Sequence, residues 1–172
     1  MTGKLESGGA MPEMDLPLAG GGIVHIGGPR ETYQVVIVYR GKHCPVCKKY
    51  LGPLTSLLGD FKNVNAEVVA VSADPQDKAE ADVERGGWKF PVAYDMTPDQ
   101  MRALGLYISH PRSDSETDRD FPEPALFVVN PKGEAQVIDI SNAPWVRPDL
   151  TRIASGIAHI QKNDYPIRGT AA

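Results

Sequence analysis

The sequence predicts a single α/β domain built on a mixed central β-sheet, with helices on both faces and an N-terminal β-hairpin. Strand-like and helix-like segments alternate through the first part of the chain, which is typical of parallel βαβ units. Two apolar runs joined by a proline–lysine–glycine turn come later, which indicates an antiparallel hairpin. The 172 residues suit one domain with short decorations.

The N-terminal part predicts the hairpin and two buried strands. Short apolar pieces between residues 14 and 28 are separated by glycine runs, which favour a turn between short strands. Residues 33–40, YQVVIVYR, are rich in β-branched side chains, as expected of a central strand, and residues 64–74 repeat that pattern. Residues 1–11 are small and polar, and we expect them to be disordered.

A first helix is expected to begin at Cys44 or Pro45, because proline is favoured at the first helical position. Its apolar side chains recur at helical spacing. Pro53 lies inside this pattern and is expected to kink the helix, because proline has no N–H to donate.

Three further helices follow from polarity, caps and periodicity. Residues 75–87 are polar and end in two glycines, and residues 97–106 begin with a threonine suited to the N-cap. Residues 147–161 form an amphipathic pattern. Its apolar face consists of Leu150, Ile153, Ala154 and Ile157.

The remaining segments complete the predicted domain, which spans residues 12–161. Residues 90–95 suggest a short strand, and residues 125–140 the late hairpin. Residues 110–124 are charged and proline-rich without a period, and we expect a long surface loop. Residues 162–172 are expected to be a tail without a regular element.

Composition limits the classes of function. The formal net charge of −4 argues against a general binder of nucleic acid or of anionic membranes. No window approaches eighteen apolar residues, and the first thirty residues hold no apolar segment of signal-peptide length. We therefore expect a cytoplasmic protein that contacts neither membrane nor nucleic acid.

The two cysteines of the chain, Cys44 and Cys47, stand at the expected start of the first helix. Backbone N–H groups and the dipole at a helix N-terminus stabilise a thiolate, and the neighbouring His43, Arg40 and Lys48 could add positive potential. Cys47 lies one turn later on the same face, from where it could attack a disulfide or a sulfenic acid formed on Cys44.

A metal clip and an inert pair are the other interpretations of this CPVC motif. A structural zinc ion needs four ligands, and the four histidines of the chain are not at a standard spacing, apart from the adjacent His43. We therefore expect neither a metal nor a cofactor. In a reducing cytosol, a lone CxxC is more often redox-active or metal-binding than a permanent disulfide.

A CxxC between a central strand and a helix, followed by βα units, a hairpin and a last helix, resembles the three-layer thioredoxin fold. The flanking segments make the chain similar to the AhpC/TSA (redoxin, peroxiredoxin-like) family of that superfamily. The segments that carry this resemblance are PEMDLPLAGGGIVHI, VVIVYRGKHCPVCKKYL, VVAVSADPQDKAEA, FPVAYDMTPDQMRALGL and PALFVVNPKGEAQVI.

The resemblance implies roles for three residues. Cys44 falls on the nucleophilic, or peroxidatic, cysteine, and Cys47 on the second cysteine of a thioredoxin-type pair. Pro124 falls where thioredoxin relatives place a cis-proline that faces the active site.

The chain departs from the pattern of peroxiredoxins at the positions around the nucleophile. Gly41 stands where they keep a threonine or serine, and Ile37 where they keep a proline. Pro124 also occupies the place of their active-site arginine, and Val38 that of the buried acid of thioredoxin. Most of the groups that activate a peroxide are therefore missing.

Together these observations predict a thiol–disulfide oxidoreductase with Cys44 and Cys47 as catalytic residues. His43, Arg40, Pro124 and Pro45 are the expected supporting residues. The alternatives are a thiol peroxidase with the same two cysteines and a non-catalytic redox sensor or metal-binding module. The expected partners are a protein or small-molecule disulfide or a peroxide, and a thiol reductant such as thioredoxin or glutathione. The oligomeric state stays open, a homodimer included.

Overall fold

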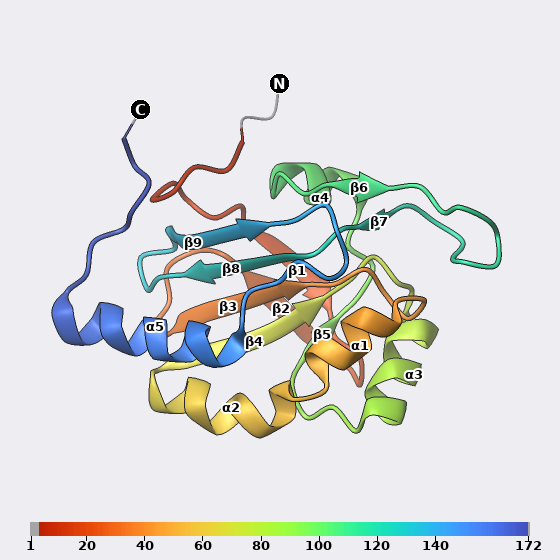
Figure 1. The fold of residues 1–172 in the computed structure, drawn as a ribbon, viewed down its shortest axis with the longest axis horizontal. Helices are drawn as coiled ribbons and strands as arrows, with labels where there is room; N and C mark the ends of the chain where they lie inside the picture. Colours follow the sequence, from red (N-terminus) through yellow and green to blue (C-terminus); the bar gives the residue numbers. More distant parts are fainter. Residues whose placement is uncertain (1–3, 172) are drawn as a thin grey trace.

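A computed structural model describes residues 4–171, and its chain folds as a layered α/β structure (Figure 1). The strands are β1 (Met14–Pro17), β2 (Ile23–Ile26), β3 (Tyr33–Val38), β4 (Ala66–Val71), β5 (Val92–Ala93), β6 (Ile108–Ser109), β7 (Phe121–Pro122), β8 (Ala125–Val129) and β9 (Ala135–Ile140). The helices are α1 (Pro45–Leu51), α2 (Leu54–Asn63), α3 (Gln76–Gly86), α4 (Pro98–Ala103) and α5 (Leu150–Asn163).

The central sheet is mixed, as the sequence predicts. Its strand order is β5-β4-β3-β8-β9, so the β-branched run of β3 occupies the middle. Val38, the last residue of β3, pairs in parallel with Val71 of β4 and antiparallel with Ala125 of β8. The predicted late hairpin is β8–β9, and the predicted N-terminal hairpin is β1–β2.

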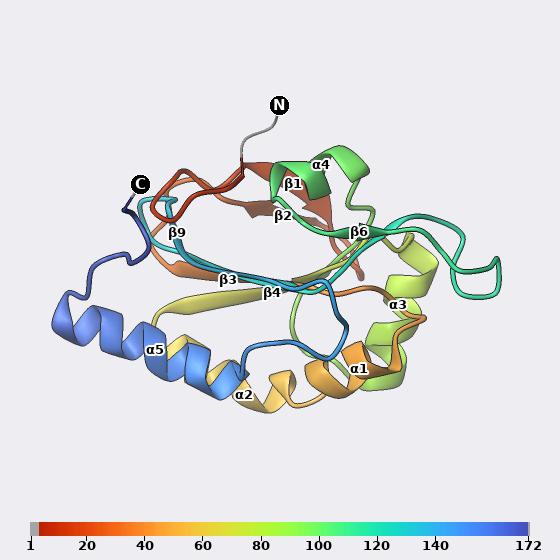
Figure 2. The ribbon, with the colours of Figure 1, turned by 45° about the horizontal axis from the view of Figure 1, so that its top comes forward.

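Two apolar cores lie on opposite faces of this sheet, each beneath the elements that Figure 2 shows on that side. Val35 and Ile37 of β3 face the core that α1, α2, α3 and α5 cover. Val36 and Val38 face the other core, which α4 and the β1–β2 hairpin cover. This arrangement confirms the predicted layers with helices on both faces.

Local sequence signals account for the ends of three helices. Thr97 forms a complete capping box with Gln100 at the start of α4, and Asp149 caps α5. The residue after α3, Gly87, has a φ of 59°, a left-handed conformation that glycine adopts without strain.

The predicted kink at Pro53 is a full break between α1 and α2. The amide of Gly52 still donates to the Lys48 carbonyl at 2.9 Å, but Pro53 has no N–H with which to continue the helix. A second helix therefore begins at Leu54, and the short α1 carries the cysteines on its own.

The expected surface loop over residues 110–124 is shorter than predicted. Phe121 and Pro122 form strand β7, which pairs antiparallel with β6. Phe121 is 2% exposed, and the burial of its apolar ring stabilises an ordered position for the end of this segment. Residues 110–120 remain as the loop of this hairpin, which extends beyond the sheet (Figure 1).

The prediction of a disordered N-terminus is wrong for residues 4–11, whereas residues 1–3 lie outside the described residues. Gly8 donates to the Ala135 carbonyl and Ala135 donates back to Gly9, both at 2.9 Å. Leu5 and Met11 are buried, and this apolar burial gives the segment its reason to be ordered. The tail after α5 runs back toward the same segment (Figure 1).

Among residues 4–171, no helix combines the length and the apolar character needed to cross a lipid bilayer.

Candidate active site

The two cysteines lie where β3 passes into α1. Cys44 is the N-cap residue of α1, and Pro45 occupies the first helical turn as predicted. The backbone amide of Cys47 donates to the Cys44 sulfur over 3.2 Å, so the first cysteine accepts a helix N-terminal N–H group. Both thiols are free, and their residues are 1% and 0% exposed.

The surroundings of Cys44 favour its thiolate. A hydrogen bond from the Cys47 thiol, the Cys47 backbone N–H and the nearby Arg40 guanidinium together lower the Cys44 pKa to about 6, against the opposing effect of burial. This value lies within the range of about 3.5–7.5 seen for activated cysteines. Near neutral pH, Cys44 is therefore mostly a thiolate.

Cys47 behaves in the opposite way. Burial, and then its hydrogen bond to Cys44, raise the pKa of the Cys47 thiol well above its ordinary value, and the positive charge of Arg147 opposes this shift. The pair therefore consists of one thiolate and one thiol that donates to it. Such a pair has a nucleophile and a protonated second sulfur one turn apart.

Arg40 contributes to both the structure and the electrostatics of the site. Its Nε lies 3.1 Å from the Glu123 Oε2, and its guanidinium lies 4.9 Å from the centre of the Phe121 ring. Glu123 is held in turn by the Ser109 hydroxyl at 2.7 Å. The ion pair with Glu123 and the predicted influence on Cys44 thus occur together.

His43 does not supply the positive potential that its sequence position suggests. Burial, followed by the nearby Arg40 charge, lowers the His43 pKa to about 4, so the ring is neutral near pH 7. The ring packs edge-on against Phe121, with centroids 4.5 Å apart. Neither ring nitrogen has a hydrogen-bond partner within residues 4–171.

Arg147 is the first of two groups at the site that the sequence did not predict. Its Nη2 donates to the Cys47 sulfur over 2.7 Å, and its guanidinium lies 5.0 Å from the centre of the Tyr50 ring. The Tyr50 hydroxyl donates to the Pro148 carbonyl at 2.5 Å, which ties α1 to the same loop. Arg147 stands 100 residues from Cys47, and no motif links the two positions.

Asp74 is the second unpredicted group, and it explains Gly41. The Lys42 amide donates to Asp74 at 2.7 Å, and burial raises the Asp74 pKa to about 6. Gly41 has a φ of +134°, and a Cβ atom there would lie 2.7 Å from the Asp74 Oδ1. A hydroxyl-bearing side chain therefore has neither the space nor the backbone conformation that it needs at residue 41.

The cis conformation expected for Pro124 is wrong, because no peptide bond within the described residues 4–171 is cis. The Glu123 amide donates to the Tyr107 carbonyl at 2.8 Å, and the Pro124 carbonyl accepts from Ser141 at 2.9 Å. An extended trans chain from β7 into β8 makes both bonds, and trans is the lower-energy isomer. Pro124 and Arg147 line the same small hollow.

No group of three or more histidine, cysteine, aspartate or glutamate side chains in the described part of the chain is placed to hold a metal ion.

A mixed five-stranded sheet with a dithiol at the start of the helix after its central strand defines a thioredoxin-like protein of the peroxiredoxin type. The chain belongs to the AhpC/TSA family, whose sequence model matches residues 7–138. The solved structure of a peroxiredoxin-like protein from Aquifex aeolicus has a TM-score of 0.77 at 17% identity, and the likeness covers 92% of this chain and 89% of that one. At this identity the likeness describes the fold alone.

Two relatives in sequence carry the names of different oxidoreductases. The thiol-disulfide oxidoreductase ResA of Halalkalibacterium halodurans is 26% identical over 58% of this chain, and the match spans only 49% of that protein. A Mycobacterium tuberculosis protein provisionally named a peroxiredoxin is 29% identical over 62% of this chain and 68% of its own length.

Proposed function

We propose that this chain is a thiol–disulfide oxidoreductase in which Cys44 is the nucleophile and Cys47 the resolving thiol. The observation that carries the proposal is the asymmetry of the pair. Cys44 accepts hydrogen bonds from the amide and the thiol of Cys47, and its pKa falls to about 6, whereas burial keeps Cys47 protonated. A reduced dithiol of this kind needs one sulfur as the nucleophilic thiolate and the other as a protonated thiol that resolves the mixed disulfide.

The geometry supports the following reaction. The Cys44 thiolate attacks one sulfur of a substrate disulfide, forms a mixed disulfide and releases the other sulfur as a thiolate. Burial is the largest cause of the raised Cys47 pKa and persists, but the mixed disulfide no longer carries the Cys44 charge, so the second cause of that rise is lost. Cys47 can then lose its proton and attack Cys44, which closes the intramolecular disulfide and releases the second substrate thiol.

Two arginines support successive steps of this sequence. Arg40 stabilises the negative charge on Cys44 before the first attack. Arg147 donates to Cys47 over 2.7 Å and favours a negative charge there during the second attack. Because Cys44 is 1% exposed, a disulfide reaches it only when the protein opens locally.

The decisive experiment follows insulin-disulfide reduction by the wild-type protein, Cys44→Ser and Cys47→Ser, with dithiothreitol as electron source. We expect Cys44→Ser to remove the activity above background. When pre-reduced Cys47→Ser protein meets insulin without dithiothreitol, it should stop after the first step and accumulate a mixed disulfide that intact-mass measurement detects. Background rates for all three proteins, without a trapped adduct, would exclude the proposal.

A thiol peroxidase is the second candidate, and the Arg40 cation beside Cys44 favours it. In that reaction, the Cys44 thiolate takes one oxygen of the peroxide and becomes a sulfenic acid, with release of water. Cys47 then displaces a second water and forms the disulfide. Asp74 occupies the space next to Gly41, so this site lacks a hydroxyl donor there. Peroxide consumption by the same three proteins distinguishes the two reactions.

The expected thiol reductant, such as thioredoxin or glutathione, and the expected cytoplasmic location remain predictions of this proposal. Pull-down of a trapped adduct from the Cys47→Ser protein, followed by identification of the bound thiol, tests the first of them.

A further inference from the structure

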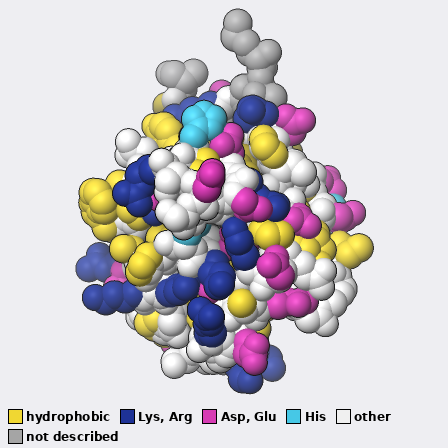
Figure 3. Space-filling view, turned by 90° about the vertical axis from the view of Figure 1, so that its right-hand side faces the viewer, with side chains coloured by type: hydrophobic (Ala, Val, Ile, Leu, Met, Phe, Trp, Pro, Cys, Tyr) yellow, Lys and Arg dark blue, Asp and Glu magenta, His cyan; other side chains and the backbone are white. Residues whose placement is uncertain are grey.

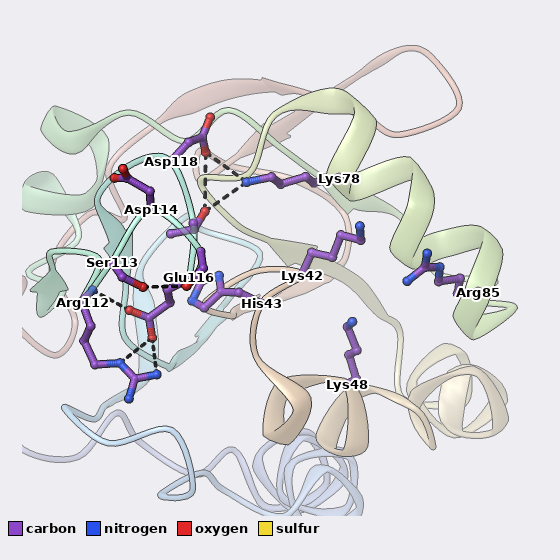
Figure 4. A pocket seen from close by; sticks show the side chains of 12 residues that line it. Lys42, His43, Lys48, Lys78, Arg85, Arg112, Ser113, Asp114, Glu116 and Asp118 are labelled. Carbon is purple, nitrogen blue, oxygen red and sulfur yellow. Dashed lines mark hydrogen bonds and ion pairs between the residues drawn. The ribbon is translucent and has the colours of Figure 1, made fainter.

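A cleft of about 620 Å³ opens beside the active site (Figure 4). Its walls are the start of α1, one side of α3 and the 110–120 loop. Lys42 and His43, the two residues before Cys44, both line it. The volume lies within the range of small-molecule sites, which is about 300–1,000 Å³.

The cleft is basic although the whole chain is acidic. Five cationic side chains and three acidic ones line it, whereas the formal net charge of the protein is −4. Lysine and arginine side chains gather on this face of the molecule (Figure 3). The cationic lining residues are Lys42, Lys48, Lys78, Arg85 and Arg112.

Two of these cations are already neutralised by the loop. Arg112 pairs with Glu116 at 2.9 Å, and Lys78 pairs with Asp118 at 3.0 Å. These pairs form the wall of the cleft on the side of the 110–120 loop, where acid and base alternate (Figure 4). A ligand therefore gains little net charge attraction from this side.

The opposite wall carries an excess of positive charge, because three lysine and arginine side chains lie around one buried acid, Asp82. Lys42 and Arg85 have no acidic partner within 4.0 Å among residues 4–171, and the Lys48 Nζ lies 3.5 Å from the buried Asp82. The charged ends of Lys42, Lys48 and Arg85 are directed toward the same opening (Figure 4). This wall can accept an anion without breaking a strong ion pair.

We infer that the cleft binds the anionic groups of a small disulfide and holds it beside Cys44, an inference that rests on the proposed function. The ligand class is a low-molecular-weight disulfide with carboxylate groups on both halves. Such a ligand fits the concave shape and the volume of the cleft. Its carboxylates can bind the cations Lys42 and Arg85, and Lys42 lies two residues before Cys44.

The reaction of this ligand balances within the protein. The reduced dithiol transfers two electrons to the disulfide RSSR and becomes the Cys44–Cys47 disulfide. One RS group leaves as a thiolate at the first attack, and the second leaves after Cys47 attacks Cys44. The thiolate–thiol pair carries one proton, so the products are one RSH and one RS⁻, which takes its proton from water at neutral pH, and a single turnover needs no other reductant.

The test uses three disulfides of matched size and different charge with the pre-reduced protein. Dithiodipropionate carries two negative charges, 2-hydroxyethyl disulfide none and cystamine two positive charges. Rate constants for a single turnover come from alkylation of the remaining thiols and intact mass, and each is divided by the rate of the same disulfide with 2-mercaptoethanol. We expect the anionic disulfide to exceed the cationic one by at least roughly tenfold at low salt.

High salt and charge variants test whether the cations of the cleft cause this preference. At 1 M salt, where the screening length is about 3 Å, the preference should fall to within about threefold. The double substitution Lys42→Gln with Arg85→Gln should reduce the low-salt preference at least about fivefold. Lys132→Gln, an exposed lysine in the β8–β9 turn, is the matched control and should leave the preference unchanged.

Binding without chemistry separates this inference from the proposed function. Dithiodipropionate titrated into the Cys44→Ser protein should shift the amide resonances of α3 and of residues 110–118. Binding that depends on Lys42 and Arg85, without any turnover by the wild type, would support anion binding in the cleft and exclude the proposed oxidoreductase function. Turnover of all three disulfides without a charge preference would overturn the inference that the cleft binds anions, and it would leave the proposed oxidoreductase function standing.

Discussion

Cys44 and Cys47 lie three positions apart and hold their protons with very different strength. Hydrogen bonds from Cys47 and the Arg40 charge lower the pKa of Cys44, while burial raises that of Cys47. The reduced protein thus contains a thiolate near neutral pH without needing an external base. This difference sets the pH range in which the first step of the proposed reaction can occur.

We expect alkylation of Cys44 by iodoacetamide to follow an apparent pKa of about 6, which is the value that the site imposes on this thiol. The rate constant should rise between about pH 5 and 7 and stay nearly constant above. The measurement is the rate at which the reduced wild-type protein gains the mass of one label on Cys44. A midpoint near that of an ordinary thiol, about 8.5, would contradict the expectation.

The same depressed pKa has a consequence for stability. A thiolate that is favoured only in the folded state stabilises the reduced protein above the pKa of the unfolded thiol. This contribution decreases as the pH falls and is lost once the pH passes below about 6.

Arg147→Gln tests the second reaction step. The substitution removes the guanidinium that donates to Cys47 over 2.7 Å, so a negative charge on Cys47 becomes less favourable. We expect closure of the disulfide to slow roughly tenfold and a mixed disulfide to accumulate, with the alkylation rate of Cys44 nearly unchanged. Quenched-flow mass analysis measures both. Arg152→Gln, an exposed position on α5, is the control, and equal slowing there would exclude a specific role.

Sequence reasoning finds the residues of the site that belong to one local motif and misses the rest. Cys44, Cys47 and Pro45 follow from the CPVC sequence at a strand–helix junction. Arg147 and Asp74 lie 100 and 32 residues from the groups they contact, and only the folded chain brings them there. A single sequence holds no periodicity or spacing that encodes such long-range pairs.

Helix α1 has seven residues, too few to be stable by itself, so its position depends on contacts with other elements. One of these is the Tyr50 hydroxyl, which donates to the Pro148 carbonyl at the loop that carries Arg147. This bond joins the element with the cysteines to the element with the arginine.

Tyr50→Phe removes this bond and keeps the ring under Arg147. We expect a loss of about 1 kcal/mol in the free energy of unfolding of the reduced protein, or roughly 2–4 °C in Tm. Thermal unfolding by circular dichroism measures it. Tyr165→Phe, at an exposed hydroxyl that accepts from Arg168, should cost clearly less. Equal losses in the two variants would show that the Pro148 bond has no special effect.

Elements with a strong local sequence pattern are predicted well, whereas an element that depends on contacts with distant residues is not. The β-branched run of β3 and the caps of α3 and α4 match the structure. The strand β7 was not predicted, because two residues give no alternation and their burial depends on Arg40 and His43 beside Phe121.

The whole molecule responds to pH through its buried acids as well as through its thiols. Burial raises the Asp74 pKa to about 6, from an ordinary value of 3.8. This group therefore stabilises the fold below the unfolded pKa, near pH 4, and that contribution is lost as the pH rises through about 6. Near neutral pH, the protein keeps a buried carboxylate at a cost to its stability.

Asp74→Asn removes the charge and can still accept from the Lys42 amide. We expect the variant to gain about 2–3 kcal/mol relative to wild type between pH 4 and pH 7, which corresponds to the shift of the pKa. Urea unfolding at several pH values measures the difference. Asp60→Asn, at an exposed position of α2, is the control and should show no such trend. A constant difference across the pH range would contradict the assignment.

The fold class follows from the sequence, whereas the charge distribution does not. The order of apolar patterns predicts the mixed sheet and its layers, and the resemblance predicts the family. The basic cleft combines cations from residue 42 to residue 112, which a net charge of −4 conceals. Three-dimensional clustering of like charges from separate elements leaves no local trace in the sequence.

Gly41 and Asp74 also constrain how this site could evolve. A side chain at residue 41 would meet the Asp74 carboxylate at 2.7 Å, so the two positions cannot change independently. A lineage that acquires a threonine at residue 41 would first have to replace Asp74 with a smaller residue and release the Lys42 amide. The order of substitutions therefore matters. As long as Asp74 is present, a hydroxyl-bearing side chain at position 41 would clash with its carboxylate.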